Sequence, residues 1–397
     1  MIDFKIKKIS SLGELTLEEV ELWRSFLTNV NDPRTVFQQP ELLFNLPNIE
    51  NRIYGIINYV VFSEGKIIGI FSFKKQVVNK VLKFGHLTIL TKKVDEIRSF
   101  GCGKLLEIPL DGQDDIKNTI VDLLKKETLQ NDSYVFLEAI EEYDLLYSFQ
   151  EKRFTQFHLD ESDTYLMYFE TDFDAFLKAR SKSKRNSIKK DLRRFEREYE
   201  GRFAIKIGPV DVSAEEFINK ANLILNRSWK KGIIGSIVGS SNFSRQLEIL
   251  NEFGLVKTFV LEVDNAPVAF AIGYYSEQNF FYEEIAYDEN FAKSGVGSYL
   301  TISAIKLLHQ KIQLNESGTK PIFSFGVGDN IYKRKLYSYK LKSKNLMLCK
   351  PSSQIKLFFQ TKVVFDYCYK SIRQGLIKLD LHTALRRRFK QRLQNKD

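Results

Sequence analysis

Residues 329–335 bring together side chains that could carry out acid–base chemistry. The segment "FSFGVGDNIYKRK" reads as a strand, a glycine-rich turn and then Asp329, Tyr332, Lys333 and Lys335. A carboxylate, a phenol and ammonium groups within seven residues are ingredients of an active site. The plain alternative is a solvated turn after an edge strand, because Gly, Asp and Asn are common turn residues. These residues alone leave both interpretations open.

A second candidate site is a pair of glycines before a helix. The run "ENFAKSGVGSYLTISAIKLLHQ" predicts the end of a strand, a loop with Gly295 and Gly297, and a helix. Glycines at such a turn let backbone N–H groups at the helix start face an anion. The spacing is neither that of a dinucleotide fingerprint nor that of a Walker A loop. An anion site and a purely structural turn are equal alternatives for these glycines. The segment "GCGK" at 101–104 is a weaker match to a phosphate-binding loop.

Cysteine and histidine are too few and too scattered to indicate a nucleophile pair or a metal site. The cysteines are odd in number and stand at no metal-ligand spacing, which favours a reducing compartment over a disulfide framework. The histidines fall in no motif. We therefore expect no metal ligand among these residues, which are Cys102, Cys349, Cys368, His86, His158, His309 and His382.

Charge is distributed unevenly along the 397 residues. The net charge is +10, and residues 350–397 hold twelve Lys and Arg against three Asp, which leaves only about +1 for residues 1–349. The positive charge is therefore local, and the net charge of the whole protein is no basis for inferring a nucleic-acid function. The length and the 43% hydrophobic content predict a packed protein of two or more domains. Without a signal peptide or a run of about 20 apolar residues, we expect a cytoplasmic protein, at most peripheral at the inner membrane face.

Periodicity predicts α/β structure in the first half of the chain. Val20, Trp23 and Leu27 form one stripe of a helix over 17–30. "RIYGIINYVVF" and "IIGIFSF" read as two strands joined by the turn "SEGK". Further strands are expected at 81–90 and 134–140, a further helix at 114–126, and the end of this half near residue 160.

The stretch "SKSKRNSIKKDLRRFEREYE" (181–200) holds eight basic residues and four acids. Steps of four, three and four place Ile188, Leu192, Phe195 and Tyr199 on one face of a helix. Ser181, Ser183 and Ser187 are candidate caps at its start. The simpler interpretation is a helix that docks by its apolar stripe and exposes its charges. The alternative is that the basic residues directly hold an anionic substrate or cofactor.

The second half predicts the same kind of unit as the first. Helices are expected at 213–230 and 242–253, followed by strands in "KTFVLEV", "VAFAIGYY" and "NFFYEEIAYD". "VLEVDNAPVAFAIGYY" (260–275) has the strand–turn–strand pattern of "VVFSEGKIIGIFSFKK" (60–75), at an offset of 200 residues. We therefore predict an α/β (α+β) protein with two tandem mixed-sheet units. The expected domains are 1–160, 161–349 and a basic helical tail at 350–397.

Three segments, in this order, resemble those of a known family. They are "SKSKRNSIKKDLRRFERE", "APVAFAIGYYSEQNFFYEEIAYDENFAKSGVGSYLTISAIKLL" and "FSFGVGDNIYKRKLY". Together they resemble the GNAT-fold acyltransferases of the cellulose or exopolysaccharide biosynthesis (CelD/BcsL) type. That type is similar to the Fem peptidyltransferases, which also carry two GNAT units in tandem. The likeness covers roughly residues 20–340 and is strongest over 164–340.

The resemblance implies an acyl donor, acetyl-CoA or another acyl-CoA, bound where the strand at 280–287 separates from its neighbour. It places the pyrophosphate on the turn at 293–298. The family's loop reads Gln/Arg-x-x-Gly-x-Gly/Ala, and Ala292 stands where Gln or Arg is expected. An acyl carrier protein or, as in the Fem branch, an aminoacyl-tRNA is the alternative donor. The implied cofactor-binding residues are Ile285, Ala286, Lys293, Ser294, Gly295, Val296 and Gly297.

The resemblance also implies that the acyl group passes directly from the donor to the acceptor, without a covalent bond to the protein. An amine or hydroxyl attacks the thioester, a base removes its proton, and an acid protonates the leaving thiolate. Glu283 and Glu284 are the base candidates. Because neighbours on a strand face opposite sides, only one should reach a given side of the cleft. Glu284, predicted on the face of Phe280 and Tyr282, is preferred as the base, and Glu283 is assigned to the substrate. A structural ion pair with the basic helix is the alternative for one of them.

Two of the remaining site residues match the family pattern. Asp329 and Lys333 match its Gly-Asp…Tyr-Lys positions and are expected to position the acceptor or the carbonyl. Tyr332 is the candidate proton donor to sulfur, unless its ring is only packed. Trp229, in "NRSWKKG", is expected in the acceptor cleft, with a core tryptophan as the alternative.

The C-terminal run "SIRQGLIKLDLHTALRRRFKQRLQNKD" predicts a basic helix. It is either solvated or attached to an anionic surface, a membrane leaflet or an acyl carrier protein. Three functions stay open. The first is acyl transfer to a small-molecule or lipid-linked sugar acceptor in cell-envelope or exopolysaccharide biosynthesis. The others are a Fem-like transferase facing tRNA with its basic segments, and a non-catalytic GNAT-fold binding subunit. DNA is not an expected partner.

Overall fold

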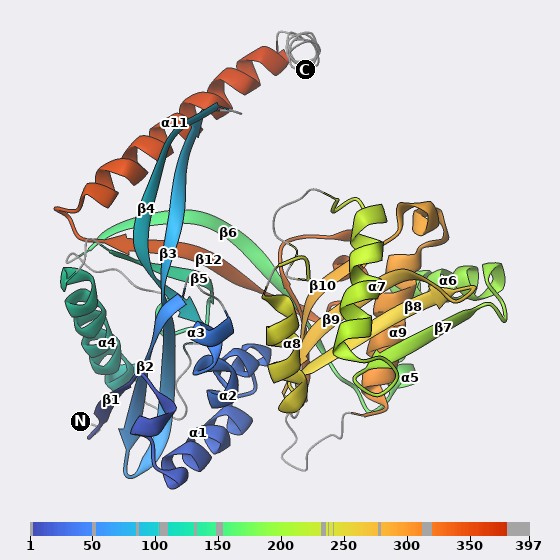
Figure 1. The fold of residues 1–397 in the computed structure, drawn as a ribbon, viewed down its shortest axis with the longest axis horizontal. Coiled ribbons are helices and arrows are strands. Elements are labelled where there is room, and N and C mark those ends of the chain that lie inside the picture. The colour runs from blue at the N-terminus through green and yellow to red at the C-terminus, as the bar shows by residue number, and fades with distance from the viewer. Residues whose placement is uncertain are drawn as a thin grey trace.

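The computed structural model shows two α/β halves that share one long mixed sheet (Figure 1). The halves lie side by side, and two strands, β6 and β12, run between them. The structure describes residues 3–49, 53–84, 87–101, 103, 110–130, 133–147, 154–231, 236, 238–240, 242–276, 279–311 and 320–378.

The N-terminal half begins with an edge strand and a helical segment and continues with long strands. Its elements are β1 (Lys5–Ile9), η1 (Leu12–Glu14), α1 (Leu17–Asn29), η2 (Pro33–Gln38), α2 (Pro40–Leu43), α3 (Leu46–Ile49), β2 (Ile53–Ser63), β3 (Lys66–Phe84), β4 (Leu87–Phe100), α4 (Leu110–Gln130), β5 (Tyr134–Glu141) and β6 (Thr155–Tyr168). The expected helices at 17–30 and 114–126 and the strand at 134–140 are confirmed. The strand expected at 81–90 is wrong, because the chain turns there between β3 and β4.

The C-terminal half repeats the strand–helix–strand order. Its elements are α5 (Phe173–Lys178), α6 (Lys182–Glu198), β7 (Phe203–Gly208), α7 (Ala214–Arg227), α8 (Phe243–Glu252), β8 (Val256–Val263), β9 (Ala266–Tyr275), β10 (Phe280–Tyr287), η3 (Glu289–Ser294), α9 (Val296–His309), β11 (Ile322–Val327), α10 (Ile331–Leu336), β12 (Tyr339–Cys349) and α11 (Gln354–Lys378). The helices and three strands predicted here from the sequence are confirmed.

The last strands of the two halves are exchanged. The sheet order is β1-β2-β3-β4-β5-β12-β6-β11-β10-β9-β8-β7. Thus β12, from the C-terminal half, pairs with β5, while β6 pairs with β11. The two exchanged strands also pair antiparallel with each other over the whole length of β12. The predicted domain boundary at residue 160 therefore falls inside β6, a strand that belongs to the sheets of both halves.

The predicted internal repeat has a structural counterpart in two hairpins. β2–β3 turns through Glu64 and Gly65, and β8–β9 turns through Asp264 and Asn265, again 200 residues apart. All four turn residues have positive φ, between 49° and 76°. This is the conformation of two-residue hairpin turns that match the twist of the flanking strands.

Each half also contains one parallel strand pair that opens. β4 and β5 pair only at 96–98 with 134–136, and β10 and β11 pair only at 280–281 with 323–324. Beyond these short ladders the strands separate. In the C-terminal half this is the separation that the resemblance implied for the strand at 280–287.

The basic helix docks as its apolar stripe predicted. Ile188 and Phe195 of α6 are fully buried, and Leu192 and Tyr199 pack at the edge of the same core. The Ser181 side chain caps the helix by accepting from the Lys184 N–H. A second core joins the two halves, since it combines Trp23 and Leu42 with residues of α7 and α8.

The predicted C-terminal helix begins at Gln354 as α11, and the part of this prediction that covers 379–397 lies outside the described residues. Within the described part of the chain, no helix combines the length and apolar character needed to cross a bilayer.

Candidate active site

A cleft of about 1590 Å³ lies between the two halves, where the opened strand pairs face it. The N-terminal wall includes η2 and the ends of β4 and β5, and the other wall includes β10, the end of β11 and α10. Six residues predicted for catalysis or substrate binding line this one cleft although they lie far apart in the chain. They are Trp229, Glu283, Glu284, Asp329, Tyr332 and Lys333.

A β-bulge in β10 changes which side chains reach the cleft. Tyr282 pairs with Gly273 of β9 and Glu284 with Ile272, so Glu283 has no partner residue. Such an extra residue reverses the alternation of faces along the strand. Accordingly, Tyr282 packs in the core beneath α9, whereas Ala286 packs in the core on the opposite face.

The bulge overturns the prediction that only one glutamate reaches the cleft. Glu284 does not share its face with Phe280 and Tyr282, and both glutamates line the cleft. Strict alternation fails here because it holds only for an unbroken ladder.

Glu284 is buried, and its partners include Lys230 and Ser236. Lys230 Nζ lies 2.8 Å from its Oε1, and the Ser236 hydroxyl lies 3.2 Å from its Oε2. Its partner is therefore Lys230, at the end of the segment after α7, and not the basic helix α6. Lys230 was not predicted, although it directly follows Trp229 in the sequence.

Glu283 has the properties of a proton acceptor. Its side chain is exposed to the cleft but enclosed by the cleft walls. Desolvation, with a smaller contribution from the Glu284 charge, raises the pKa of Glu283 to about 7. A base with a pKa near 7 can both take and release a proton at neutral pH.

Lys333 and Tyr332 supply proton donors on the other wall. The Lys333 side chain is buried and donates to the carbonyl oxygens of Val327 and Gly326, at 2.9 and 3.3 Å. Desolvation lowers the pKa of Lys333 to about 8. Desolvation raises the pKa of Tyr332 to about 12, so its phenol keeps its proton at neutral pH.

Asp329 is engaged in an ion pair on the cleft rim. Arg334 Nε donates to Asp329 Oδ1 at 2.7 Å, and the Tyr165 hydroxyl donates to the same oxygen at 3.0 Å. These hydrogen bonds, above all that from Arg334, lower the pKa of Asp329 to about 2. Asp329 is therefore a weak base, suited to positioning rather than to proton transfer.

Trp229 stands at the rim and not in the core, since 53% of its surface is exposed. Lys230 Nζ lies 5.6 Å from the centre of its ring. An exposed indole in a cleft wall offers a flat apolar surface to a bound molecule.

The turn at 293–298, which is predicted to bind the acyl donor, follows the end of β10 that has separated from β11. Ile285 lines the cleft, Ala286 and Val296 are buried in the core, and Lys293 is exposed. Gly295 has a φ of 78° and precedes the first turn of α9. A Cβ on Gly297 would lie 2.8 Å from the Tyr287 ring, so close packing also requires this glycine.

An arginine reaches this turn from the basic helix. Arg194 Nε of α6 donates to the Ser294 carbonyl at 3.0 Å, and its guanidinium lies where a side chain of Gly295 would stand. The guanidinium thus lies beside Gly295, three residues after Ala292 in the sequence. Ala292 is the position at which the family pattern has Gln or Arg. The spacing along the sequence gave no signal for this contact, which spans 100 residues.

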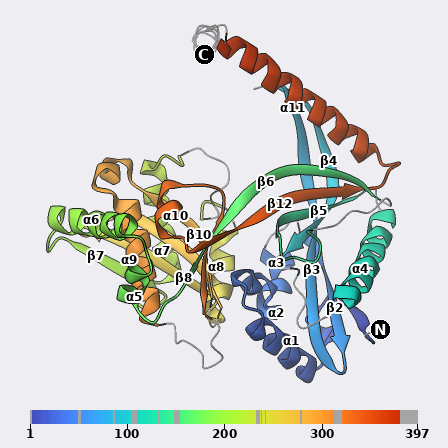
Figure 2. The ribbon, with the colours of Figure 1, turned by 180° about the vertical axis from the view of Figure 1, so that it is seen from behind.

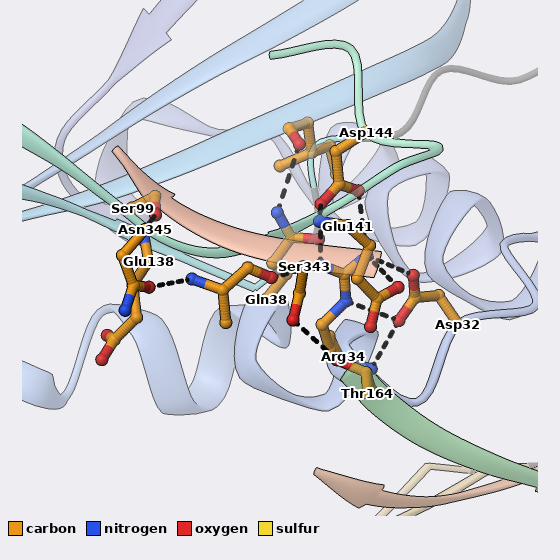
Figure 3. Close-up of polar contacts among 12 residues, drawn as sticks. Asp32, Arg34, Gln38, Ser99, Glu138, Glu141, Asp144, Thr164, Ser343 and Asn345 are labelled. Carbon is orange, nitrogen blue, oxygen red and sulfur yellow. Dashed lines mark hydrogen bonds and ion pairs between the residues drawn. The ribbon is translucent and has the colours of Figure 1, made fainter. Parts of the chain in front are cut away.

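The N-terminal wall contains a buried ionic network that sequence reasoning missed (Figure 3). Arg34 contacts the carboxylates of Asp32, Glu141 and Asp144 at 2.7–3.0 Å, and all four side chains are nearly inaccessible. Beside the network, the Ser99 hydroxyl oxygen accepts a hydrogen bond from the Glu138 N–H, 2.8 Å away. The network fixes η2 to the end of β5 in the N-terminal wall of the cleft.

Among the described residues, no group of His, Cys, Asp and Glu is placed to hold a metal ion. The structure adds charged residues to the predicted set, among them Lys230, Arg34 and Arg194.

Residues 182–334 match the family model described as acetyltransferase (GNAT) domain. This segment of the C-terminal half is therefore similar to a GNAT acetyltransferase domain, and the match supports the predicted GNAT relationship for these residues. The comparisons do not reach the narrower CelD/BcsL type, which stays a prediction. No curated protein matches the sequence of the chain.

Solved structures share the fold of nearly the whole chain at low sequence identity. FemX has 10% identity and a TM-score of 0.59, with 89% of this chain and 99% of that chain covered. A tandem GNAT protein from the clavulanic acid biosynthesis pathway has 10% identity and a TM-score of 0.51 (88% and 100% covered). A conserved protein of unknown function from Bacteroides thetaiotaomicron has 12% identity and a TM-score of 0.51 (88% and 100%). The predicted α/β fold of tandem GNAT-like units is confirmed.

Proposed function

We propose that the chain is an acyltransferase that moves an acyl group, acetyl in the simplest case, from coenzyme A to an amine or hydroxyl. The observation that carries the proposal is Glu283, a carboxylate placed by a bulge in the opening between β10 and β11, with a pKa raised to about 7. A cleft with a base, two proton donors and a GNAT domain around it suits acyl transfer.

The turn before α9 has the features of a diphosphate site. The N–H groups of residues 296–298 precede the first hydrogen bond of the helix, which Tyr299 donates to Gly295. Arg194 and Lys293 add positive charge beside these donors. Arg194 would thus provide the charge that Ala292 does not.

The acyl-CoA would supply a thioester carbonyl and a thiolate leaving group. In the proposed mechanism Glu283 takes the proton of the acceptor amine or hydroxyl as its nitrogen or oxygen bonds to the carbonyl carbon. Tyr332 gives a proton to the sulfur as the carbon–sulfur bond breaks. Lys333 and Asp329 hold the end of β11 and α10 in place and provide charge on the opposite wall.

The acceptor would occupy the N-terminal side of the cleft, between Trp229 and the wall of η2, β4 and β5. Its volume and the many polar groups around it suit a polar acceptor larger than a single amino acid. This is consistent with a sugar, free or lipid-linked, in cell-envelope or exopolysaccharide biosynthesis, the role that the sequence resemblance implied.

The deciding experiment is calorimetric titration of acetyl-CoA into wild type, Arg194→Ala and Arg193→Ala. Arg193 is the matched control, because it neighbours Arg194 on α6 but is exposed. We expect binding to wild type and to the control, and at least about tenfold weaker binding to Arg194→Ala, the scale of one lost charge-assisted hydrogen bond.

Other outcomes would redirect the assignment. Equal binding by both variants would contradict the role of Arg194 while leaving acyl-CoA as the donor. No binding at millimolar acetyl-CoA would contradict this donor. Salt-dependent binding of aminoacyl-tRNA would then favour a Fem-like transferase, and failure to bind either donor would favour a non-catalytic GNAT-fold subunit.

A further inference from the structure

Helix α11 and the β3–β4 hairpin project together beyond the rest of the N-terminal half (Figures 1 and 2). The helix packs on β3 through its inner face, where Ile355, Phe358 and Phe359 are buried. These residues share a small core with Leu82 and Val94 of the hairpin. The inner face therefore accounts for the packing of the helix on the hairpin. It does not account for the apolar residues on the outer face.

The outer face of α11 also exposes large apolar side chains. Leu357, Val364, Tyr367 and Ile372 have 68%, 59%, 73% and 51% of their surfaces exposed. Leu357 and Val364 are two helical turns apart, and Tyr367 follows one turn later, so they continue one side of the helix. A helix that is apolar on a buried and on an exposed face is not an ordinary solvated helix. We call these four residues the outer stripe.

The end of the β3–β4 hairpin also exposes apolar side chains. Ile89 and Leu90 of β4 are about half exposed, at 51% and 49%, beside the exposed lysines Lys83 and Lys93. The two leucines of the cross-strand pair Leu82–Leu90 face the same side of the hairpin, the side on which α11 packs.

Positive charge is concentrated in the same region. Residues 350–397 carry the net charge of +9, and residues 379–397, which follow the helix, hold six Lys and Arg against two Asp. Exposed aliphatic and aromatic side chains flanked by Lys and Arg are the chemistry by which helices bind anionic lipid surfaces.

We propose that the outer stripe of α11, with the end of the β3–β4 hairpin, binds the surface of an anionic lipid bilayer. The stripe enters the headgroup region, and the surrounding basic residues bind lipid phosphates. Charge decides against a second copy of the chain as the occupant, because two copies of residues 350–378, each with six Lys and Arg against one Asp, would then face each other. The bilayer complements both the apolar and the charged part of the surface.

The test is co-sedimentation of the full-length protein with vesicles, either phosphatidylglycerol mixed with phosphatidylcholine or phosphatidylcholine alone. We expect binding only to the anionic vesicles, and binding that weakens as the salt concentration rises. The double variant Leu357→Glu/Val364→Glu should lower binding at least tenfold. Val210→Glu/Leu223→Glu, an equal charge change at exposed apolar residues of the C-terminal half, should bind like wild type.

Thermal melts followed by circular dichroism check that both double variants are folded. Three outcomes would overturn the proposal. The wild type could fail to bind anionic vesicles, or the two double variants could bind equally. Sedimentation equilibrium could also show a wild-type dimer that Leu357→Glu/Val364→Glu dissociates, which would make a second copy the occupant.

The basic segment after the helix needs a separate comparison. A chain ending at residue 378 should bind anionic vesicles more weakly but should still respond to Leu357→Glu/Val364→Glu. If this chain loses all binding while the double variant of the full chain binds normally, the segment 379–397 alone attaches the protein, and the outer stripe has no part in it.

Discussion

At the scale of residues, the two adjacent glutamates of β10 have different environments. Glu284 is buried against Lys230 and Ser236, and Glu283 is exposed to the cleft with its pKa raised to about 7. Two carboxylates that differ in this way can divide the roles of base and supporting charge. The structure thus favours Glu283 over Glu284 as the base.

We expect Glu283→Gln to lower the turnover number by about 10²–10⁴, the usual contribution of a general base. In wild type, activity should rise through pH 7, because Glu283 must lose its proton before it can accept one. It should fall above about pH 8 as Lys333 loses its ammonium charge. Rate profiles from pH 5 to 10 check this.

Glu284→Gln is the matched variant. Removal of the Glu284 charge lowers the pKa of Glu283, because that charge helps to raise it, so the acid limb should move to lower pH while activity persists. If Glu284→Gln is as inactive as Glu283→Gln and the acid limb stays near pH 7 in the remaining activity, Glu284 and not Glu283 is the base.

At the scale of elements, the site depends on how strands and short helices are fixed at the cleft. β10 and β11 separate after two paired residues, and α10 carries Tyr332 and Lys333 directly after β11. On the other wall, η2 is held by the Arg34 network and by Phe37, whose ring contacts Tyr274 and Phe281 at about 5 Å. Contacts at η2 therefore help to set the width of the cleft.

Arg34→Met should destabilise the protein by about 3–5 kcal/mol, because it leaves three buried carboxylates without their cation. Arg24→Met is the control, since Arg24 is half exposed and pairs with Glu21 and Glu41 at the surface. Its cost should stay below about 1 kcal/mol. Urea unfolding followed by fluorescence measures both, and equal small costs would contradict a structural role for the network.

At the scale of the whole molecule, the exchange of β6 and β12 makes the halves depend on each other. Without β12, β5 keeps only its short ladder with β4, and without β6, β11 keeps only its short ladder with β10. One apolar core also contains residues of both halves, among them Leu42 and Leu247. The chain should therefore unfold as one unit, although its sequence pattern suggests two.

We expect the fragment 161–349, one of the two units that the sequence suggests, to be unfolded when expressed alone. It would expose the edge of β12 and lack the start of β6. Fragments 1–153 and 154–397, expressed together, should instead form a folded complex. Size-exclusion chromatography and circular dichroism check both results, and a folded monomer of 161–349 would show that the exchange is dispensable.

The sequence by itself determined what depends on neighbouring residues. The stripe of α6, the helices α1 and α4 and the two hairpins could be predicted because their periodicities and turn residues are local signals. The sequence and the resemblance together also named six residues that line one cleft. Their roles, and the donor and acceptor, stay predictions until the proposed measurements are made.

Only the tertiary structure decided the features that depend on pairing between distant segments. The bulge at Glu283 exists through the register of β10 on β9, so no pattern within β10 reveals it. The exchanged strands, the contact of Arg194 with Ser294 and the Arg34 network join residues about 100 or more positions apart. Such contacts form only when the chain closes long loops, and a local sequence pattern carries no record of them.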